Sequence, residues 1–224
     1  MKKKIFAIAL AASIAVLAIA GTSMAYFTDT EEYTNVFTTG NVEIQLSEAA
    51  VKDDGVGNLV LDDTANRTII NDTPATKDYG KIFPSQTIYK DPTIKNIGSE
   101  TAYIGAIITI ESTVFNSIVV ENDIKKFITD INSNATVTYE KTTNGYKLYM
   151  IFEDKTAVGT EYILFKGIKV FDAWDHDQMK NLSDLTITVN AYATQTAGFA
   201  DAKTALTTAF ATKGWGTLPT NVLP

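Results

Sequence analysis

The most strongly patterned segment of the chain reads Tyr103-Ile104-Gly105-Ala106-Ile107-Ile108-Thr109-Ile110. Isoleucine, threonine and tyrosine favour extended backbone, because their side chains pack well on a pleated surface. The run from Ile104 to Ile108 is almost continuously apolar, whereas a strand with one wet face alternates between apolar and polar residues. We therefore predict a long strand at residues 103–110 with both faces covered by other parts of the protein.

Shorter strand patterns lie on both sides of this segment. Residues 42–46 alternate between apolar and polar side chains, which predicts a strand with one buried face. Residues 136–140 and 146–152 form two more predicted strands, joined by a hairpin at Asn144-Gly145. Strands are also predicted at residues 161–170 and 185–194, and in the second of these one face consists of Leu185, Ile187, Val189, Ala191 and Ala193.

Two helices are predicted outside the strands. The first follows from the helical spacing of Ile124, Phe127, Ile128 and Ile131, with Asn122 as its N-cap. The second covers residues 199–213, and Gly214 stands at the position where glycine often ends a helix. About seven to nine short strands with one or two short peripheral helices indicate an all-β fold, an antiparallel β-sandwich.

The polar segment at residues 48–78 interrupts the strand pattern. Short apolar pieces at residues 59–61 and 69–70 are expected to be edge strands in this loop-rich, acidic insertion. Its pairs Asp53-Asp54 and Asp62-Asp63 vaguely resemble a calcium loop, but the spacing and the terminal glutamate of an EF-hand are missing. A charged insertion is the preferred interpretation, and weak extracellular calcium binding is the alternative.

A proline also interrupts a strand pattern. Asp91-Pro92 lies between apolar residues of strand type, and a proline there confines a strand to an edge or a bulge. We therefore expect residues 88–97 to lie at an edge or to contain a bulge.

A secretory leader is predicted at residues 1–25. Three lysines at positions 2–4 precede an apolar run at residues 5–20, and Ser23 and Ala25 supply the small residues at the −3 and −1 positions of a cleavage site. The apolar run has about 16 residues, fewer than the ~20 that cross a bilayer. We expect cleavage after Ala25, with an uncleaved N-terminal anchor as the alternative.

Composition limits the partners of the mature chain. Without the three leader lysines the net charge falls from −7 to −10, which argues against nucleic acid and anionic lipid as partners. The sequence contains no cysteine, so the core holds without disulfides. No apolar run of spanning length follows residue 25, and we expect no membrane contact after cleavage. The predicted organisation is a leader at residues 1–25, an N-terminal segment at 26–40 and one sandwich domain at 41–224.

We find no catalytic motif in the sequence. The single histidine, His176, lies in a polar segment, and the His-Glu-x-x-His motif of zinc proteases is absent. A catalytic zinc ion usually takes three protein ligands. We interpret residues 171–178 as a solvated turn and predict a protein that is not an enzyme and needs no cofactor.

Three further segments match a known family in their order and spacing. They are residues 25–42, which begin Ala25-Tyr26-Phe27; residues 89–104, which begin Tyr89-Lys90-Asp91-Pro92; and residues 187–196. The acidic insertion at residues 48–78 has no counterpart. Together these segments resemble the TasA/camelysin family of exported proteins, whose leaders are cut by a dedicated, SipW-type signal peptidase.

The resemblance implies a jelly-roll sandwich that polymerises outside the cell into fibres, as TasA does in biofilm matrix. The N-terminal segment of one copy would add as a strand to the next, with accessory matrix proteins as further partners. Asp29 and Glu31 share one side of the segment with its apolar residues, which weakens the register, so a flexible stub or the domain's own first edge strand is the alternative. The side chains expected to fill pockets in the neighbour are Tyr26, Phe27, Tyr33, Val36 and Phe37.

Two other functions stay open at this point. Camelysin-type relatives carry a metalloprotease label, which implies a cell-surface peptidase, although the sequence lacks a zinc motif. A monomeric surface adhesin is compatible with the same fold, because a fold alone does not specify a function.

Overall fold

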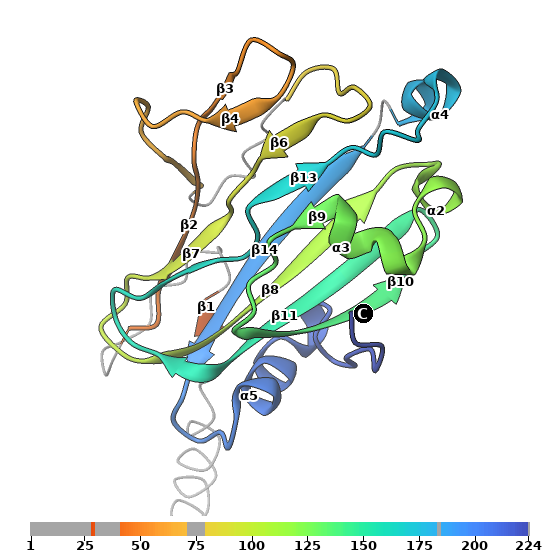
Figure 1. Cartoon of the computed structure of the whole chain (residues 1–224). Helices are drawn as coiled ribbons and strands as arrows, with labels where there is room; N and C mark the ends of the chain where they lie inside the picture. The colour runs from red at the N-terminus through yellow and green to blue at the C-terminus, as the bar shows by residue number, and fades with distance from the viewer. Residues whose placement is uncertain (1–27, 30–40, 71–78, 183–184, 224) are drawn as a thin grey trace, which may run out of the picture.

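A five-stranded sheet, called sheet A here, runs through the middle of the molecule (Figure 1). The computed structural model describes residues 28–29, 41–70, 79–182 and 185–223. All strand pairs of sheet A are antiparallel. In spatial order its strands are β1 (Thr28–Asp29), β14 (Thr186–Gln195), β8 (Ala102–Glu111), β11 (Gly145–Thr156) and β10 (Ala135–Lys141).

Two smaller sheets form the second layer. Sheet B has the order β12 (Glu161–Ile163), β7 (Thr93–Asn96), β2 (Ile44–Glu48) and β5 (Thr68–Ile70). Sheet C has the order β3 (Val51–Asp53), β4 (Leu59–Leu61), β6 (Thr87–Tyr89), β13 (Gly167–Lys169) and β9 (Ile128–Thr129). Only the contact between β4 and β6 is parallel among the strand pairs of the described residues. The short helices are α2 (Phe115–Ile118), η1 (Glu121–Asp123), α3 (Ile124–Phe127), α4 (His176–Asn181), α5 (Ala202–Ala209) and η2 (Ala211–Lys213).

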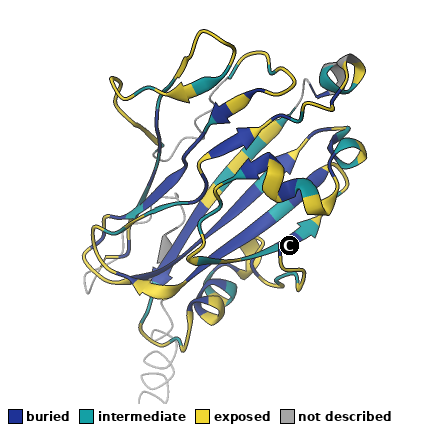
Figure 2. Cartoon of the chain, viewed as in Figure 1, coloured by how far each residue is buried: buried dark blue, intermediate teal, exposed yellow. Residues whose placement is uncertain are grey.

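The side chains of β8 alternate between two apolar cores. Ile104 and Ile108 belong to the inner core, which also contains Ile94 of sheet B and Ile168 of sheet C. Tyr103 and Ile107 belong to the outer core, on the opposite face of sheet A. The prediction of a strand covered on both faces is confirmed, and β8 and its neighbours are the most buried part of the chain in Figure 2.

The outer core joins sheet A to the C-terminal part of the chain. Leu206 of α5 and Trp215 both lie fully buried on the outer face. A Cβ atom added at Gly105 of β8 would come within 2.6 Å of the Trp215 ring and 2.8 Å of the Leu206 side chain. A glycine in the middle of the most apolar strand therefore makes room for the C-terminal segment.

Sheets B and C continue each other across a line of breaks, called the seam here. The chain passes between the two sheets at three places: from β2 to β3, from β6 to β7 and from β12 to β13. At each place the strand is interrupted for a few residues, and the three interruptions lie next to one another. The amide of Leu164 donates to the carbonyl of Pro92 at 2.9 Å, and the amide of Ala49 donates to the Asp91 carboxylate at 2.9 Å. Residues 88–97 were expected to lie at an edge or to contain a bulge. In the structure β6 and β7 are both interior strands, and Asp91-Pro92 lies in the break between them.

The middle helix is shorter than the spacing of its apolar residues predicts. Helix α3 ends at Phe127, and its N-cap is Asp123 rather than Asn122, with no side-chain capping bond. Ile128 leaves the helix and pairs with Ile168 of β13, so pairing with sheet C overrides the helical periodicity. The C-terminal helix is confirmed over Ala202–Ala209, and Gly214 adopts the left-handed conformation expected after a helix, with φ 100°.

Most of the remaining strand predictions agree with the structure. Two do not: residues 161–170 form two strands, β12 and β13, with a break between them, and the expected edge strand at residues 59–61 is β4, which lies between β3 and β6 inside sheet C. Strands β10 and β11 form the predicted hairpin, but Gly145 is needed for space rather than for its backbone angle, because an added Cβ would lie 1.8 Å from the carbonyl oxygen of Ile110. The predicted face of residues 185–193 packs on the inner core. The fold is thus mostly β with a few short helices, and jelly-roll connectivity stays a prediction. Within the described part of the chain, no helix has the length and apolar character needed to cross a bilayer.

Candidate functional site

The outer edge of β14 is one border of sheet A. Along its inner edge β14 pairs with β8 over its whole length, from Thr186 opposite Glu111 to Gln195 opposite Ala102. Along its outer edge the described residues contribute only β1, with Thr28 opposite Thr194 and Asp29 opposite Ala193. β14 has ten residues, so most of its outer edge has no strand partner within the described part of the chain.

The sequence of β14 contains none of the usual protection of an edge strand. Natural edges are blunted by charged residues, prolines or bulges, because a free row of backbone N–H and C=O groups accepts strands from other chains. Residues 186–195 contain no charged residue and no proline. Ala193 and Thr194 are fully buried where β1 covers them. Within the described part of the chain, β1 is the strand that this edge holds.

The predicted assembly and cleavage residues lie outside the described residues. These are Ser23, Ala25, Tyr26, Phe27, Tyr33, Val36 and Phe37. Within the same segment, Thr28 and Asp29 lie on the edge of their own chain. For these two residues the structure matches the alternative interpretation, a first edge strand of the domain, and it shows where an N-terminal segment fits.

A second polar site lies at the seam, beneath the acidic insertion. The ammonium of Lys90 lies 2.7 Å from the carboxylate of Glu48, and both side chains are 8% exposed. The hydroxyl of Tyr79 donates to the same carboxylate. Burial first, and then the negative charge of Glu48, raises the pKa of Tyr79 above its ordinary value, so this phenol remains a neutral donor.

Asp91, the residue after Lys90, connects the insertion to the seam through hydrogen bonds. Its carboxylate accepts hydrogen bonds from Arg67 at 2.7 Å and from the Tyr89 hydroxyl at 3.1 Å, as well as from the backbone of Ala49. Arg67 also donates to the Thr93 hydroxyl at 2.6 Å. Because the Asp91 side chain is 2% exposed, these bonds satisfy a charge that would otherwise be costly to bury.

Sequence reasoning missed the partners in this cluster. Glu48 and Lys90 are 42 residues apart, and no periodic pattern connects them. The only signal was the segment Tyr89-Lys90-Asp91-Pro92, which carried part of the family resemblance. In the structure this segment supplies Lys90 and Asp91, whose polar contacts stabilise the break between β6 and β7.

A comparison with protein families gives one match that covers most of the chain. The model of the family described as camelysin metallo-endopeptidase matches residues 1–199. This chain belongs to the camelysin family. The resemblance to the TasA/camelysin family is therefore confirmed. No curated protein and no solved structure matches the chain.

The family description names a metallo-endopeptidase, and the metal donors among the described residues do not fit that description. The described residues contain no group of three histidine, cysteine, aspartate or glutamate side chains that could hold a metal ion. The sequence has one histidine and no cysteine. Glu48 and Asp91, the most buried carboxylates of the seam, are bound to Lys90 and Arg67.

The segment around the single histidine of this chain contains a helix rather than only the predicted turn. Asp175 caps helix α4: its carboxylate accepts from the amide of Gln178 at 2.8 Å, and the Gln178 side chain accepts from the amide of Asp175 at 2.9 Å. The prediction of a turn at residues 171–178 was therefore wrong over its second half. The spacing of Asp175 and Gln178 is that of a capping box, which is the signal that sequence reasoning overlooked.

Asp54 and Asp62, two described aspartates of the acidic insertion, accept hydrogen bonds from their own loops. The Asp54 carboxylate accepts from the amides of Val56 and Asn58, both at 2.9 Å. The Asp62 carboxylate accepts from the hydroxyl of Thr64 at 2.6 Å. The side-chain amide of Asn58 also donates to the Asp54 carboxylate at 2.8 Å, and this bond, ahead of the backbone ones, lowers the pKa of Asp54 below its ordinary value. The bond from the Thr64 hydroxyl lowers the pKa of Asp62 in the same way. The arrangement is that of structural turns, which is the preferred interpretation of the insertion.

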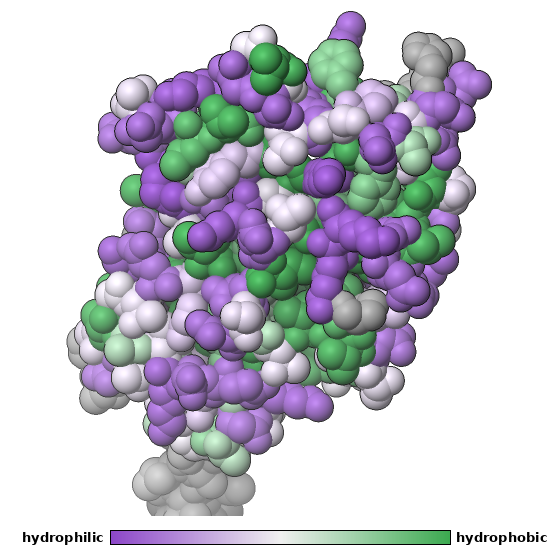
Figure 3. Space-filling model, in the orientation of Figure 1, coloured by the Kyte–Doolittle hydropathy of each residue, from purple (hydrophilic) through white to green (hydrophobic). Residues whose placement is uncertain are grey.

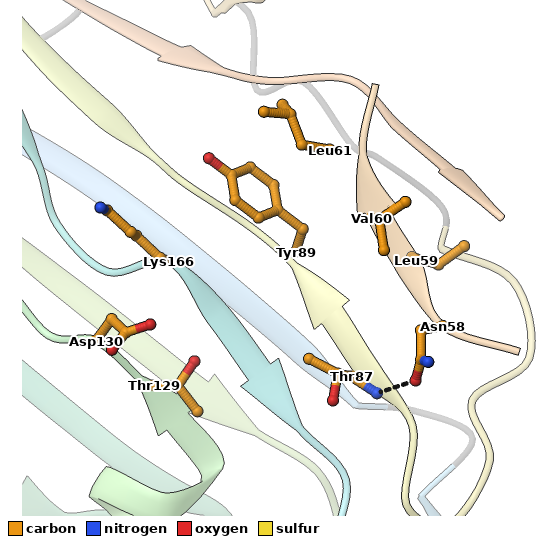
Figure 4. Close-up of a pocket in the computed structure, with 9 residues that line it drawn as sticks. All are labelled: Asn58, Leu59, Val60, Leu61, Thr87, Tyr89, Thr129, Asp130 and Lys166. Carbon is orange, nitrogen blue, oxygen red and sulfur yellow. Dashed lines mark hydrogen bonds between the residues drawn. The ribbon is translucent and has the colours of Figure 1, made fainter. Parts of the chain in front are cut away.

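An open pocket of about 260 Å³ lies on sheet C, lined by residues of β4, β6 and β9 and of the segments beside them (Figure 4). One wall is apolar, with Val60 and Leu61, and the other carries Asp130 and Lys166. Apolar side chains are exposed nearby on the insertion, where Figure 3 shows apolar surface among polar atoms. Asp130 is the only carboxylate among the described residues that line the pocket, so they offer no pair of carboxylates for hydrolysis.

Proposed function

We propose that this protein is a secreted structural subunit that assembles into extracellular fibres of a biofilm matrix or cell-surface layer. Each copy donates its N-terminal segment as a strand to the next copy. The observation that carries the proposal is the pairing of Thr28 and Asp29 with β14, at an edge strand without charge or proline. Membership of the camelysin family supports it.

The physical basis of donation is the exchange of one strand partner for an identical one. An extended segment satisfies the backbone groups of a sheet edge whether it belongs to the same chain or to another copy. When the segment leaves its own edge and occupies a neighbour's, the backbone hydrogen bonds that break within one chain form again between two chains. The pairing of β1 with β14 thus gives the expected register, with Asp29 opposite Ala193.

Leader removal controls when this exchange begins. Cleavage after Ala25 by a SipW-type signal peptidase would release a segment that starts at Tyr26, two residues before β1. Until then the apolar leader at residues 5–20 keeps the segment attached to the membrane. The partners are therefore other copies of the same chain, together with accessory matrix proteins. Tyr26, Phe27, Tyr33, Val36 and Phe37 are the side chains expected to enter pockets of the neighbour.

A peptide-binding experiment tests whether β14 accepts a strand from outside. A labelled peptide of residues 26–37 should bind a chain that begins at residue 38, as measured by fluorescence anisotropy. The matched control peptide carries Thr28→Pro and Asp29→Pro, because proline has no N–H to donate and interrupts strand pairing. Equal affinity of the two peptides, or no binding of either, would contradict strand donation.

Electron microscopy tests the polymer itself. The mature chain that starts at Tyr26 should form filaments in negative stain, and the chain that begins at residue 38 should not. Equal filament formation by the two would show that the N-terminal segment has no part in assembly. A mature chain that stays monomeric at every concentration in size-exclusion chromatography would favour a surface adhesin instead.

The family name favours a second candidate, a cell-surface peptidase. The described residues contain no group of three metal donors, so a metal site of this chain would have to include side chains that the structure does not describe. Casein hydrolysis by the purified mature chain that disappears with His176→Ala would support the peptidase. Hydrolysis that survives this substitution would show that His176 is not needed for it.

A further inference from the structure

The last residues of the chain lie on the border of sheet A opposite to β14. The amide of Tyr139 in β10 donates to the carbonyl of Asn221 at 2.9 Å, and the amide of Leu223 donates to the carbonyl of Val137 at 3.1 Å. Thr138 and Val222 form the antiparallel bridge between these two bonds. The C-terminus therefore lies beside β10, as Figure 1 shows. Residues 216–223 are called the tail here.

The tail crosses from one face of sheet A to the other. At its start Trp215 is fully buried in the outer core, and Leu218 packs against the same core. At its end Leu223 is 5% exposed and belongs to the inner core. Val222, between the two bonds to β10, is 66% exposed. The tail is thus anchored on both sides of the sheet and covers the edge between them.

The edge that the tail covers would otherwise be an efficient site of strand addition. Residues 135–139 of β10 are Ala-Thr-Val-Thr-Tyr, without charge or proline. Edges of this composition recruit strands from other chains. The tail itself is a poor template, because Pro219 precedes and Pro224 follows its three paired residues, and proline cannot donate to a further strand.

The tail is built into this fold rather than laid on its surface. Gly105 makes room for Trp215, and the Trp215 ring lies 5.9 Å from the Tyr149 ring and 5.5 Å from the Tyr192 ring. The family model ends at residue 199, so α5 and the tail lie beyond the part that the family match covers. The two borders of sheet A therefore differ: β14 holds a two-residue strand, and β10 is closed by an anchored tail.

We propose that the tail is an edge guard, which closes β10 and confines strand addition between copies of this chain to the β14 edge. The proposal rests on the proposed function only in naming β14 as the edge that grows. When the guard is released, two β10 edges pair antiparallel across a two-fold axis, because an edge strand of this type is complementary to itself. The excluded partner is thus the β10 strand of a second copy.

Two substitutions at neighbouring residues distinguish the release of the tail from a general effect of an added negative charge. Leu223→Asp places a carboxylate in the inner core and should release the tail, whereas Val222→Asp places the same charge on the exposed residue beside it. In the full-length mature chain, hydrogen exchange of the Tyr139 amide should become about tenfold faster or more in Leu223→Asp and stay unchanged in Val222→Asp. Continued protection of this amide in Leu223→Asp would overturn the anchoring role of the tail.

The oligomeric state tests the guard independently of fibre formation. Both substitutions are placed in a chain that begins at residue 38 and carries Thr188→Lys, so that no donor segment is present and a lysine on β14 discourages strand pairing at that edge. Light scattering should show a dimer for Leu223→Asp and a monomer for Val222→Asp. A monomer for both, with the Tyr139 amide exposed in the first, would overturn the guard, while failure of the mature chain to form fibres would contradict only the proposed function.

A shortened chain covers the case in which Leu223→Asp does not fold. Removal of residues 219–224 takes away the paired residues and Leu223 but retains Trp215 and Leu218. This chain should keep the far-ultraviolet circular dichroism of the full chain and form the same dimer. Loss of folding in the shortened chain as well would identify the tail as an essential part of the core and overturn its role as a guard.

Discussion

The carboxylate of Glu48 and the ammonium of Lys90 form an ion pair of 2.7 Å in which each side chain is 8% exposed. The pair lies at the seam, where β2 gives way to β3 and β6 gives way to β7. Glu48 continues the inward face of β2, since Ile44, Leu46 and Glu48 are all buried. The last buried residue of the inward face of β2, Glu48, is thus charged. Its partner, Lys90, lies in the loop between β6 and β7.

The first prediction concerns the stability of this pair. Lys90→Met should lower the free energy of unfolding by about 3–5 kcal/mol, because it leaves the Glu48 carboxylate buried without its counter-ion. The double variant Glu48→Leu and Lys90→Met should recover most of the loss. Urea unfolding at neutral pH measures both, and equal losses for the single and the double variant would contradict the argument.

An exposed ion pair provides the matched control for this measurement. Lys95 and Glu161 lie 2.8 Å apart on β7 and β12, with side chains 39% and 54% exposed. Lys95→Met should cost only about 0–1 kcal/mol, because water screens this pair. A cost as large as that of Lys90→Met would show that burial does not set the difference.

The second prediction concerns the growing edge. Thr188→Lys places a positive charge on an exposed residue of β14 and should slow filament formation strongly, because lysine on an edge strand discourages pairing. Thr136→Lys places the same charge on an exposed residue of β10 and should leave the rate unchanged. Light scattering during assembly gives both rates, and inhibition by Thr136→Lys alone would reverse the assignment of the edges.

The third prediction concerns the contact between β8 and the C-terminal segment. Gly105→Ala should destabilise the protein by about 1–3 kcal/mol, because the added methyl group overlaps the Trp215 ring and the Leu206 side chain. Leu206→Ala removes one of these neighbours, so in that background the cost of Gly105→Ala should be smaller. A double-mutant cycle with thermal unfolding measures the coupling, and simple additivity would contradict the contact.

The fourth prediction concerns alkaline pH. Burial, followed by the charge of Glu140, raises the pKa of Tyr149 from 10.0 to about 12. The unfolded chain loses this proton at lower pH than the folded chain, so the contribution is complete below pH 10 and is lost as the pH rises through about 12.

The variant Tyr149→Phe isolates that contribution. The drop in urea midpoint between about pH 9 and about pH 11 should be smaller in the variant than in the original chain, because phenylalanine has no proton to lose. The hydrogen bond from Tyr149 to Glu140, at 3.1 Å, disappears at both pH values and cancels in the comparison. An identical drop in both proteins would show that Tyr149 is not responsible.

Local patterns predicted the strands of this fold because each pattern reports burial on one or two faces. The continuous apolar run around Ile107 correctly predicted a strand between two cores, and the alternation from Leu185 to Ala193 correctly predicted a strand over one. The helical spacing from Ile124 to Ile131 was misleading, because Ile128 finds a strand partner far away in the sequence. Periodicity records which side chains are buried, and not which backbone pairing buries them.

The site was less predictable than the fold. The N-terminal segment was recognised from the cleavage site and the family resemblance, but its place beside Ala193 and Thr194 depends on three-dimensional pairing. The ion pair at the seam and the bond from Leu223 to Val137 likewise join segments that no short-range pattern connects. Only the capping box at Asp175 left a local signal that sequence reasoning overlooked.

The position of the tail has a practical consequence for engineering. Because Val222 and Leu223 lie beside β10, a cargo domain fused after the tail would be attached at the border of the sheet that faces away from β14. Under the proposed strand donation, filaments built from such fusions should carry one cargo per subunit along their length. A fusion placed before Tyr26 should instead hinder the proposed donation.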